Sequence, residues 1–215
     1  MKRMISILSL GMALAGVAGF LRAQEVIDRI AARVEGEVIL LSEIQELARY
    51  QLLVDGKSES DDQILSRLID QWIVRNEANL ARFQTPSDDE VDRSLASMKR
   101  SFSSPEEFEA RKKQSGFSDE ELRHMLRSQL YLSNYLDARF RPAIQVSDQA
   151  IDDFYKKRVV PRAESRGQTA PTMEAAREYI QEALVQRAIN EQADKWLKES
   201  RPRLRVENLL AEKAQ

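Results

Sequence analysis

The sequence predicts a mainly α-helical fold with a small antiparallel sheet that joins an N-terminal hairpin to a C-terminal strand. Helix-start signals recur along the chain, mostly a serine followed three residues later by an acid or a glutamine. Two stretches, RIAARVEGEVIL (29–40) and RLRVENL (203–209), instead alternate apolar and polar residues as strands do. Glycine is scarce, at 7 of 215 residues, and 32% of residues are charged, which is typical of long exposed helices.

Residues 1–23 are expected to be a signal peptide that is absent from the folded protein. Lys2 and Arg3 precede a long apolar run, the layout of a secretory signal sequence. Cleavage is expected after Ala23, with Ala18 as the alternative. An uncleaved anchor is the other interpretation, because the run has about the minimum length of a membrane span. No later segment is apolar enough to cross a bilayer, so no stable membrane insertion is expected after cleavage.

The hairpin is predicted over residues 29–40, with a two-residue turn at Glu35–Gly36 where glycine tolerates positive φ. Ser42 should open the first helix, with Gln45 completing a capping box. Alternate residues should form one apolar face: Ile30, Ala32, Val34, Val38 and Leu40.

The helices follow from the start signals and from apolar stripes. Their expected ranges are 43–54, 61–82, 88–102, 105–114, 119–140, 148–158 and 173–199. The later N-caps are expected at Ser87, Ser104, Ser118, Ser147 and Thr172. Trp72 and Trp196 lie on apolar stripes and are interpreted as core residues.

The remaining segments are a linker and a third strand. Residues 159–171 contain two prolines and a glycine and are predicted to be the linker. The strand near 203–209 should join the hairpin, because two strands alone are marginal in water. The two ends of the mature chain should therefore meet.

Removal of residues 1–23 makes the chain more acidic. Lys2, Arg3 and Arg22 are the charged residues of that segment, so 30 basic residues remain against 35 acidic ones, a net charge of −5. This balance argues against nucleic acid as a partner. The absence of cysteine excludes disulfides and thiolate zinc sites.

Three stretches resemble the SurA-type family of periplasmic chaperones: EVIDRIAARVEGEVILLSEI (25–44), ILSRLIDQWIVRNEA (64–78) and ADKWLKESRPRLRVENL (193–209). The resemblance implies one module, built from a helical region at 24–158 and a C-terminal part at 172–215. It also implies ATP-independent binding of unfolded outer-membrane or secreted polypeptides in the periplasm.

The same resemblance highlights a difference. Most members of the family carry one or two parvulin-type prolyl isomerase domains where this chain has the linker at 159–171. The chain is therefore expected to be the chaperone module alone.

No catalytic, cofactor or metal chemistry is expected. His124 is the single histidine, so Glu121-Leu-Arg-His124 lacks the second Glu-x-x-His motif of a di-iron bundle. Acidic clusters at the predicted helix starts complement the helix dipole. The sequence contains neither a nucleophile elbow nor a glycine-rich phosphate loop.

Client binding is predicted for a groove rich in methionine and aromatic residues in the middle of the chain. Methionine is flexible and polarizable, which suits varied clients. The alternative is that these side chains simply close the helical layer. The predicted residues are Leu95, Met98, Phe102, Phe108, Phe117, Met125, Tyr131 and Tyr135.

Three other interpretations stay open. The module could be an envelope scaffold that binds one specific partner. It could, less favourably, be a prolyl isomerase with a reduced site. A homodimer could also form by strand or helix swapping, because the terminal strand could pair with the hairpin of another copy.

Overall fold

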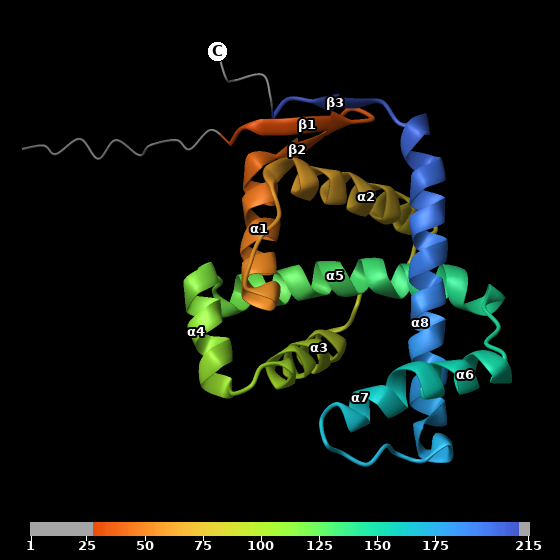
Figure 1. The fold of residues 1–215 in the computed structure, drawn as a ribbon. Coiled ribbons are helices and arrows are strands. Elements are labelled where there is room, and N and C mark those ends of the chain that lie inside the picture. The colour runs from red at the N-terminus through yellow and green to blue at the C-terminus, as the bar shows by residue number, and fades with distance from the viewer. Residues whose placement is uncertain (1–27, 211–215) are drawn as a thin grey trace, which may run out of the picture.

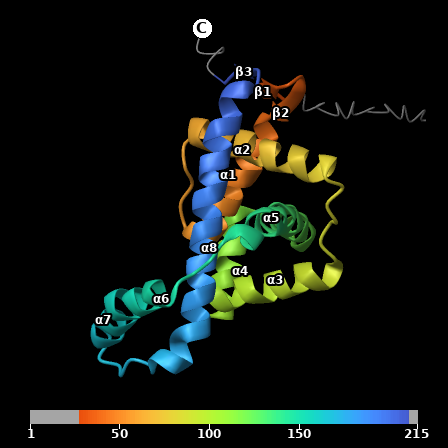
Figure 2. The same ribbon diagram turned by 90° about the vertical axis from the view of Figure 1, so that its right-hand side faces the viewer.

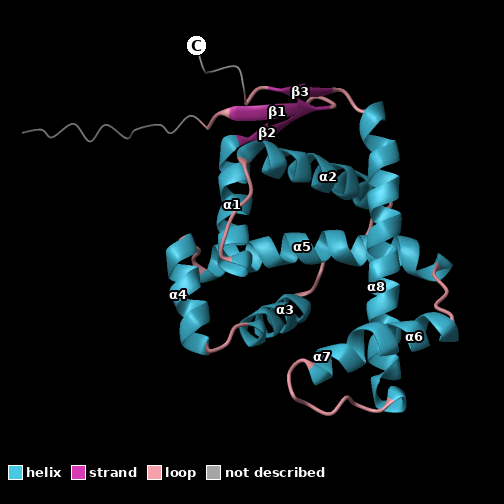
Figure 3. Ribbon diagram, in the orientation of Figure 1, coloured by secondary structure: helices cyan, strands magenta, loops and turns pink. Residues whose placement is uncertain are grey.

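Helices make up most of the described chain, residues 28–210 of the computed structural model (Figures 1 and 3). The expected signal peptide lies outside the described residues. The strands are β1 (Ile30–Val34), β2 (Glu37–Leu40) and β3 (Val206–Asn208). The α-helices are α1 (Leu41–Asp55), α2 (Asp61–Leu80), α3 (Asp88–Ser101), α4 (Pro105–Ser115), α5 (Asp119–Phe140), α6 (Asp148–Phe154), α7 (Val160–Glu164) and α8 (Met173–Ser200). Short helical turns are η1 (Arg141–Ala143), the π-helical η2 (Tyr155–Val159) and η3 (Arg201–Arg203). The predicted mainly α fold is confirmed.

The sheet joins the two ends of the described chain, as predicted. Its strand order is β2-β1-β3, with both pairings antiparallel. Arg33 lies opposite Glu207, and Val34 lies opposite Val206. The first strand of the hairpin is therefore the central strand, and the C-terminal strand closes its free edge (Figure 1).

The predicted turn at Glu35–Gly36 is confirmed, but the predicted apolar face is wrong at Val38. Both turn residues have positive φ, 48° and 92°. The turn pairs Ala32 with Ile39 and Arg33 with Val38. Paired residues point to the same side of a sheet, so Ile39 is 4% exposed whereas Val38 is 47% exposed.

The start of α1 also differs from the prediction at Ser42. The helix begins at Leu41, directly after β2, and the N–H of Leu40 donates to the Glu43 carboxylate over 2.7 Å. The N–H of Ser42 donates to Asp28 over 3.3 Å. Because strand and helix are continuous here, residues on either side satisfy the free N–H groups of the first turn. The later predicted N-caps are confirmed: Ser87, Ser104, Ser118, Ser147 and Thr172.

The predicted linker at 159–171 is helical over its first part, because α6, η2 and α7 follow one another without a break. Pro161 lacks an N–H, and its ring would clash with a carbonyl of the preceding helical turn. The π turn widens the helix just before it, with the N–H of Val160 donating to the carbonyl of Tyr155. Pro161 then occupies the first turn of α7, where proline is tolerated.

The apolar residues form four separate clusters instead of one core. The sheet cluster lies under the hairpin and between α1 and α2: Ala31, Ala32, Val34, Ile39, Ile44, Leu47, Ile64, Leu65 and Ile69. The α3–α5 cluster joins the end of α1 to α3, α4 and α5: Leu53, Val91, Phe108, Phe117, Leu122, Met125 and Leu126. The crossing cluster lies where α2, α5 and α8 meet: Val74, Ala78, Leu132 and Tyr135. The arm cluster joins α6 to α8: Ile151, Ala176 and Ile180.

The two tryptophans pack as predicted. Trp72 is half-buried against the sheet cluster and its indole N–H donates to the Glu37 carboxylate over 2.8 Å. Trp196 is half-buried against the crossing cluster, and the Arg139 guanidinium lies 4.7 Å from its ring centre. Each large ring thus joins a helix to a neighbouring element.

Arg201 attaches the end of α8 to the middle of α2. Its guanidinium donates to the Ser66 carbonyl over 2.5 Å, to the Ser66 hydroxyl over 2.8 Å and to the Asp70 carboxylate over 2.8 Å. Burial raises the pKa of Asp70 even though Arg201 favours its charged form. Desolvation therefore offsets much of the ionic attraction, and the three hydrogen bonds together hold the contact.

Substitution Arg201→Met is expected to lower the free energy of unfolding by about 1–2 kcal/mol, because it leaves the Ser66 carbonyl and Asp70 without this donor. The measurement is urea unfolding followed by circular dichroism. Arg203→Met is the matched control, since Arg203 is exposed two residues away, and it should change stability by less than about 0.5 kcal/mol. Equal effects of the two substitutions would contradict this role of Arg201.

Candidate functional site

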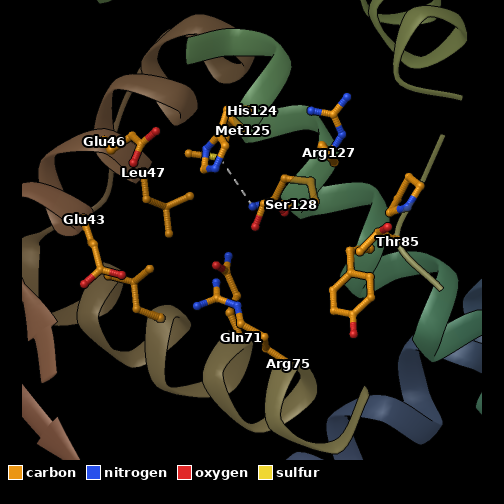
Figure 4. Close-up of a pocket in the computed structure, with 14 residues that line it drawn as sticks. Glu43, Glu46, Leu47, Gln71, Arg75, Thr85, His124, Met125, Arg127 and Ser128 are labelled. Atoms are coloured by element: carbon orange, nitrogen blue, oxygen red, sulfur yellow. Dashed lines mark hydrogen bonds between the residues drawn. The ribbon is translucent and has the colours of Figure 1, made fainter. Parts of the chain in front are cut away.

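The candidate site is a hollow of about 410 Å³ between α1, α2 and α5 (Figure 4). Its lining side chains come from these three helices and from the segment that leaves α2. They are Glu43, Glu46, Leu47, Leu68, Gln71, Arg75, Thr85, Pro86, His124, Met125, Arg127, Ser128, Gln129 and Tyr131. A volume of this size is in the range of sites that hold a small organic group.

The hollow combines apolar side chains with charges of both signs. One apolar side chain from each helix lines the hollow: Leu68 is half-buried, whereas Leu47 and Met125 are only 5% and 8% exposed and present small apolar areas to it. The Gln129 amide lies 3.7 Å from the Met125 sulfur, the contact drawn in Figure 4. The lining of the hollow is therefore amphipathic.

The charges are divided between the walls of the hollow. Glu43 and Glu46 lie on the α1 wall, whereas Arg75 lies on α2 and Arg127 on α5. Arg127 also forms an ion pair with Asp88 at the start of α3. Mixed charges give the rim no strong preference for the sign of a client.

A second hollow of about 540 Å³ adjoins the first, between α1, α2 and the loop that connects them. The two share Leu47, Gln71 and Gln129 in their linings. These three side chains therefore form the common wall between the hollows. Together the hollows form an amphipathic surface that follows the inside of the α1–α2 pair.

Glu59 ties the α1–α2 loop to both helices at the rim of the second hollow. Its carboxylate accepts hydrogen bonds from Arg67 over 2.6 Å and from Gln51 over 2.9 Å, and its own N–H donates to Gln51 over 2.9 Å. The Arg67 hydrogen bond, followed by that from Gln51, lowers the pKa of Glu59 to about 2. The loop is thus fixed by a charged side chain that stays ionised well into the acid range.

The structure divides the eight predicted client-binding residues among three places. Met125 and Tyr131 line the first hollow, and Met125 is also a buried member of the α3–α5 cluster. Tyr135 is buried in the crossing cluster. The other five lie in or against the α3–α5 cluster: Leu95, Met98, Phe102, Phe108 and Phe117.

Several of these residues are closed off from a client in this conformation. Phe108 is 1% exposed and Phe117 is 4% exposed. The rings of Phe102 and Phe108 lie 5.3 Å apart in an edge-to-face arrangement. The structure thus places Phe108 within a helical layer and not along an open groove, while Leu95, Met98 and Phe102 are half-buried at its edge. Client binding by the eight residues stays a prediction.

Sequence reasoning missed most of the residues that line the hollow. Gln71, Ser128 and Gln129 are polar residues beside apolar stripes, so their own helices give no signal of a site. Leu68 lies on an apolar stripe of α2, and Leu47 is an apolar residue of α1, so neither by itself indicates a site. A shared site emerges only when three helices are placed together.

The described residues contain neither a metal-ligand cluster nor a membrane span. Between residues 28 and 210, no group of three or more His, Asp or Glu side chains is placed to hold a metal ion. None of the helices in that range is both long enough and apolar enough to cross a bilayer.

A comparison with protein families identifies the chain. The model of the SurA-like N-terminal domain matches residues 1–136, more than half of the sequence. The chain belongs to the SurA-like N-terminal domain family. The match includes the hairpin, α1 to α4 and most of α5, and thus every element that lines the first hollow. No curated protein sequence matches this chain.

Phe108→Ala is expected to lower the free energy of unfolding by about 3–5 kcal/mol, because it leaves a cavity in the α3–α5 cluster. Phe102→Ala should cost less, since Phe102 is half-buried at the edge of that cluster. Denaturant unfolding of the two variants measures the difference. A Phe108→Ala variant as stable as the wild type would place Phe108 outside the core in solution and favour the open groove.

The stabilising effect of Glu59 is expected to disappear in acid. Its pKa of about 2 lies below the ordinary value of 4.5, so its contribution is present above pH 4.5 and is lost as the pH falls towards 2. Glu59→Gln should therefore lower stability at neutral pH, and its difference from the wild type should shrink between pH 4.5 and 2. Thermal unfolding at a series of pH values measures this. A difference independent of pH would contradict it.

Proposed function

We propose that the protein is an ATP-independent holdase of the periplasm that covers exposed apolar segments of unfolded outer-membrane or secreted polypeptides. The amphipathic hollow between α1, α2 and α5 is the observation that carries this proposal, because the matched family domain contains all of its walls. An extended chain would place apolar side chains against Leu47, Leu68 and Met125. Its backbone would meet the polar side chains of the rim.

Binding of a client segment in this hollow is expected to be weak and reversible. Its apolar area is modest and its rim is hydrated, so the affinity for any one segment is low. A client would leave when it buries the same apolar side chains within itself. Methionine in the lining adapts to different side chains, which favours a broad client range.

The charge of the protein supports the same function. The net charge is −5 once residues 1–23 are removed, because Lys2, Arg3 and Arg22 leave with that segment. Net charge far from zero keeps a protein soluble. A complex loaded with apolar client would therefore resist association with other complexes.

The first test uses an unfolded outer-membrane β-barrel protein diluted from urea, with aggregation followed by light scattering and no nucleotide present. The mature protein should suppress aggregation at near-stoichiometric amounts, whereas an inert acidic helical protein should not. Suppression no better than that of the inert protein would overturn the general holdase. Capture of one folded envelope partner would then favour the scaffold alternative.

The hollow itself is tested with Ser128→Arg, which places a long charged side chain among the apolar side chains. The new side chain would cover part of the apolar lining, so more protein should be needed for the same suppression. A loss of about 1.4 kcal/mol of binding free energy corresponds to roughly tenfold more protein. Ser133→Arg is the matched control, because Ser133 is exposed on α5 and does not line the hollow. Equal suppression by both variants would show that clients bind elsewhere.

A further inference from the structure

The segment α6–η2–α7 forms an arm that extends from the side of the molecule (Figures 1 and 2). The arm packs on the N-terminal half of α8 through the arm cluster. Two adjoining hollows of about 390 Å³ and 610 Å³ are lined by the arm and by one residue each of α8, and they share Phe154, Arg158 and Arg162 in their linings.

The linings of the two arm hollows are strongly basic. Across both, the charged lining residues of the described chain are all lysine or arginine: Lys157, Arg158, Arg162, Arg166 and Arg187. This contrasts with the whole sequence, where 35 acidic residues outnumber 33 basic ones. The basic arm surface is defined here by Arg158, Arg162 and Arg166.

The three arginines of the basic arm surface are available to a ligand. All three are exposed, and no described carboxylate forms an ion pair with any of them. The other two cations differ, since Lys157 pairs with Asp153 at 3.0 Å and Arg187 pairs with Glu191 at 2.8 Å. An arginine guanidinium binds carboxylates with two parallel hydrogen bonds, so these three side chains are chemically suited to an anionic ligand.

Two aromatic side chains and a loop held by hydrogen bonds lie beside the arginines. Tyr179 of α8 is 74% exposed and lines the smaller hollow with the half-buried Phe154. The loop after α7 is held in place, because the Tyr155 hydroxyl donates to the Pro171 carbonyl over 2.6 Å. The N–H of Gln168 donates to the Ala163 carbonyl over 2.9 Å, which fixes the turn that carries Arg166.

The three arginines come from successive parts of the arm. Arg158 lies in η2, Arg162 in α7 and Arg166 in the turn after α7. The guanidinium groups are therefore spread along the arm, and a bound segment that carries several carboxylates would meet more than one of them.

We propose that the basic arm surface binds an acidic polypeptide segment, with carboxylates against the three arginines and an aromatic side chain against Tyr179. The arginines surround concave hollows, which a peptide can enter and a flat bilayer cannot follow. The basic arm surface is separate from the first hollow between α1, α2 and α5. Binding of an acidic segment there would be a function in addition to the proposed holdase activity. It would give the protein a second, charge-selective contact with a polypeptide partner.

The test measures binding of a short fluorescein-labelled peptide, in which glutamate alternates with threonine and one tyrosine, to the mature protein by fluorescence anisotropy. Exposed ion pairs contribute about 0.2–1 kcal/mol each, so the triple substitution R158Q/R162Q/R166Q should weaken binding about tenfold. Binding to the wild type should also weaken as salt is raised. The same peptide with glutamine in place of glutamate should bind far more weakly.

The matched control is R93Q/R100Q/K113Q, which removes three exposed cations from α3 and α4 and changes the net charge equally. It should leave peptide affinity within about twofold, and circular dichroism should show both variants folded. If both variants weakened peptide binding equally, the effect would be due to net charge alone, and the proposed site would be wrong. Binding of phosphatidylglycerol vesicles that depends on the three arginines, without peptide binding, would also overturn it and point to a membrane contact.

Discussion

The pairing of β3 with β1 is the contact on which the position of the C-terminal end of α8 depends. α8 is about 42 Å long for its 28 residues, and it contacts the arm cluster, the crossing cluster and, through Leu204 beyond its end, the sheet cluster. A helix of that length can pivot about one packed contact. The strand pairing and the Arg201 hydrogen bonds fix its far end, so α8 holds α2 and α5 at a set angle. The N-terminal hairpin and the C-terminal strand thus complete one sheet, which neither could form alone.

The division of the apolar residues into four clusters explains why a helical protein has an amphipathic hollow. Each cluster fills a junction between helices, and the sheet, α3–α5 and crossing clusters surround the polar side chains Gln71, Ser128 and Gln129. Arginines link these junctions. Arg49 lies 4.6 Å from the ring centre of Phe117 and donates to the Gly116 carbonyl, while Arg141 pairs with Asp137 and Glu182. The four small clusters therefore make the helix junctions rigid and leave a hollow with polar side chains between them.

The errors of prediction share one physical cause, which is that the decisive contact lies outside the local pattern. Val38 continues an apolar alternation, but the turn at Glu35–Gly36 sets the register that places Ile39 inside. Ser42 has capping-box spacing, but strand β2 runs directly into the helix, and the carboxylates of Glu43 and Asp28 accept the N–H groups of Leu40 and Ser42. Pro161 predicts an end to the helix, yet a single π turn lets the helix continue.

The sequence by itself determined the type, order and approximate bounds of nearly every element, the closure of the sheet by the C-terminal strand, and the resemblance to the family that the comparison then identified. The elements follow from local sequence, because caps, turns and apolar periodicity depend on residues a few positions apart. The closure of the sheet was predicted because a two-stranded hairpin needs a third strand to be stable. Tertiary structure alone decided which apolar helix face packs against which other face. It closed Phe108 into a layer, left Leu68 and Met125 facing a hollow, and aligned three arginines beside Tyr179. Periodicity gives each helix an apolar side, but long-range packing decides whether that side faces another helix or water.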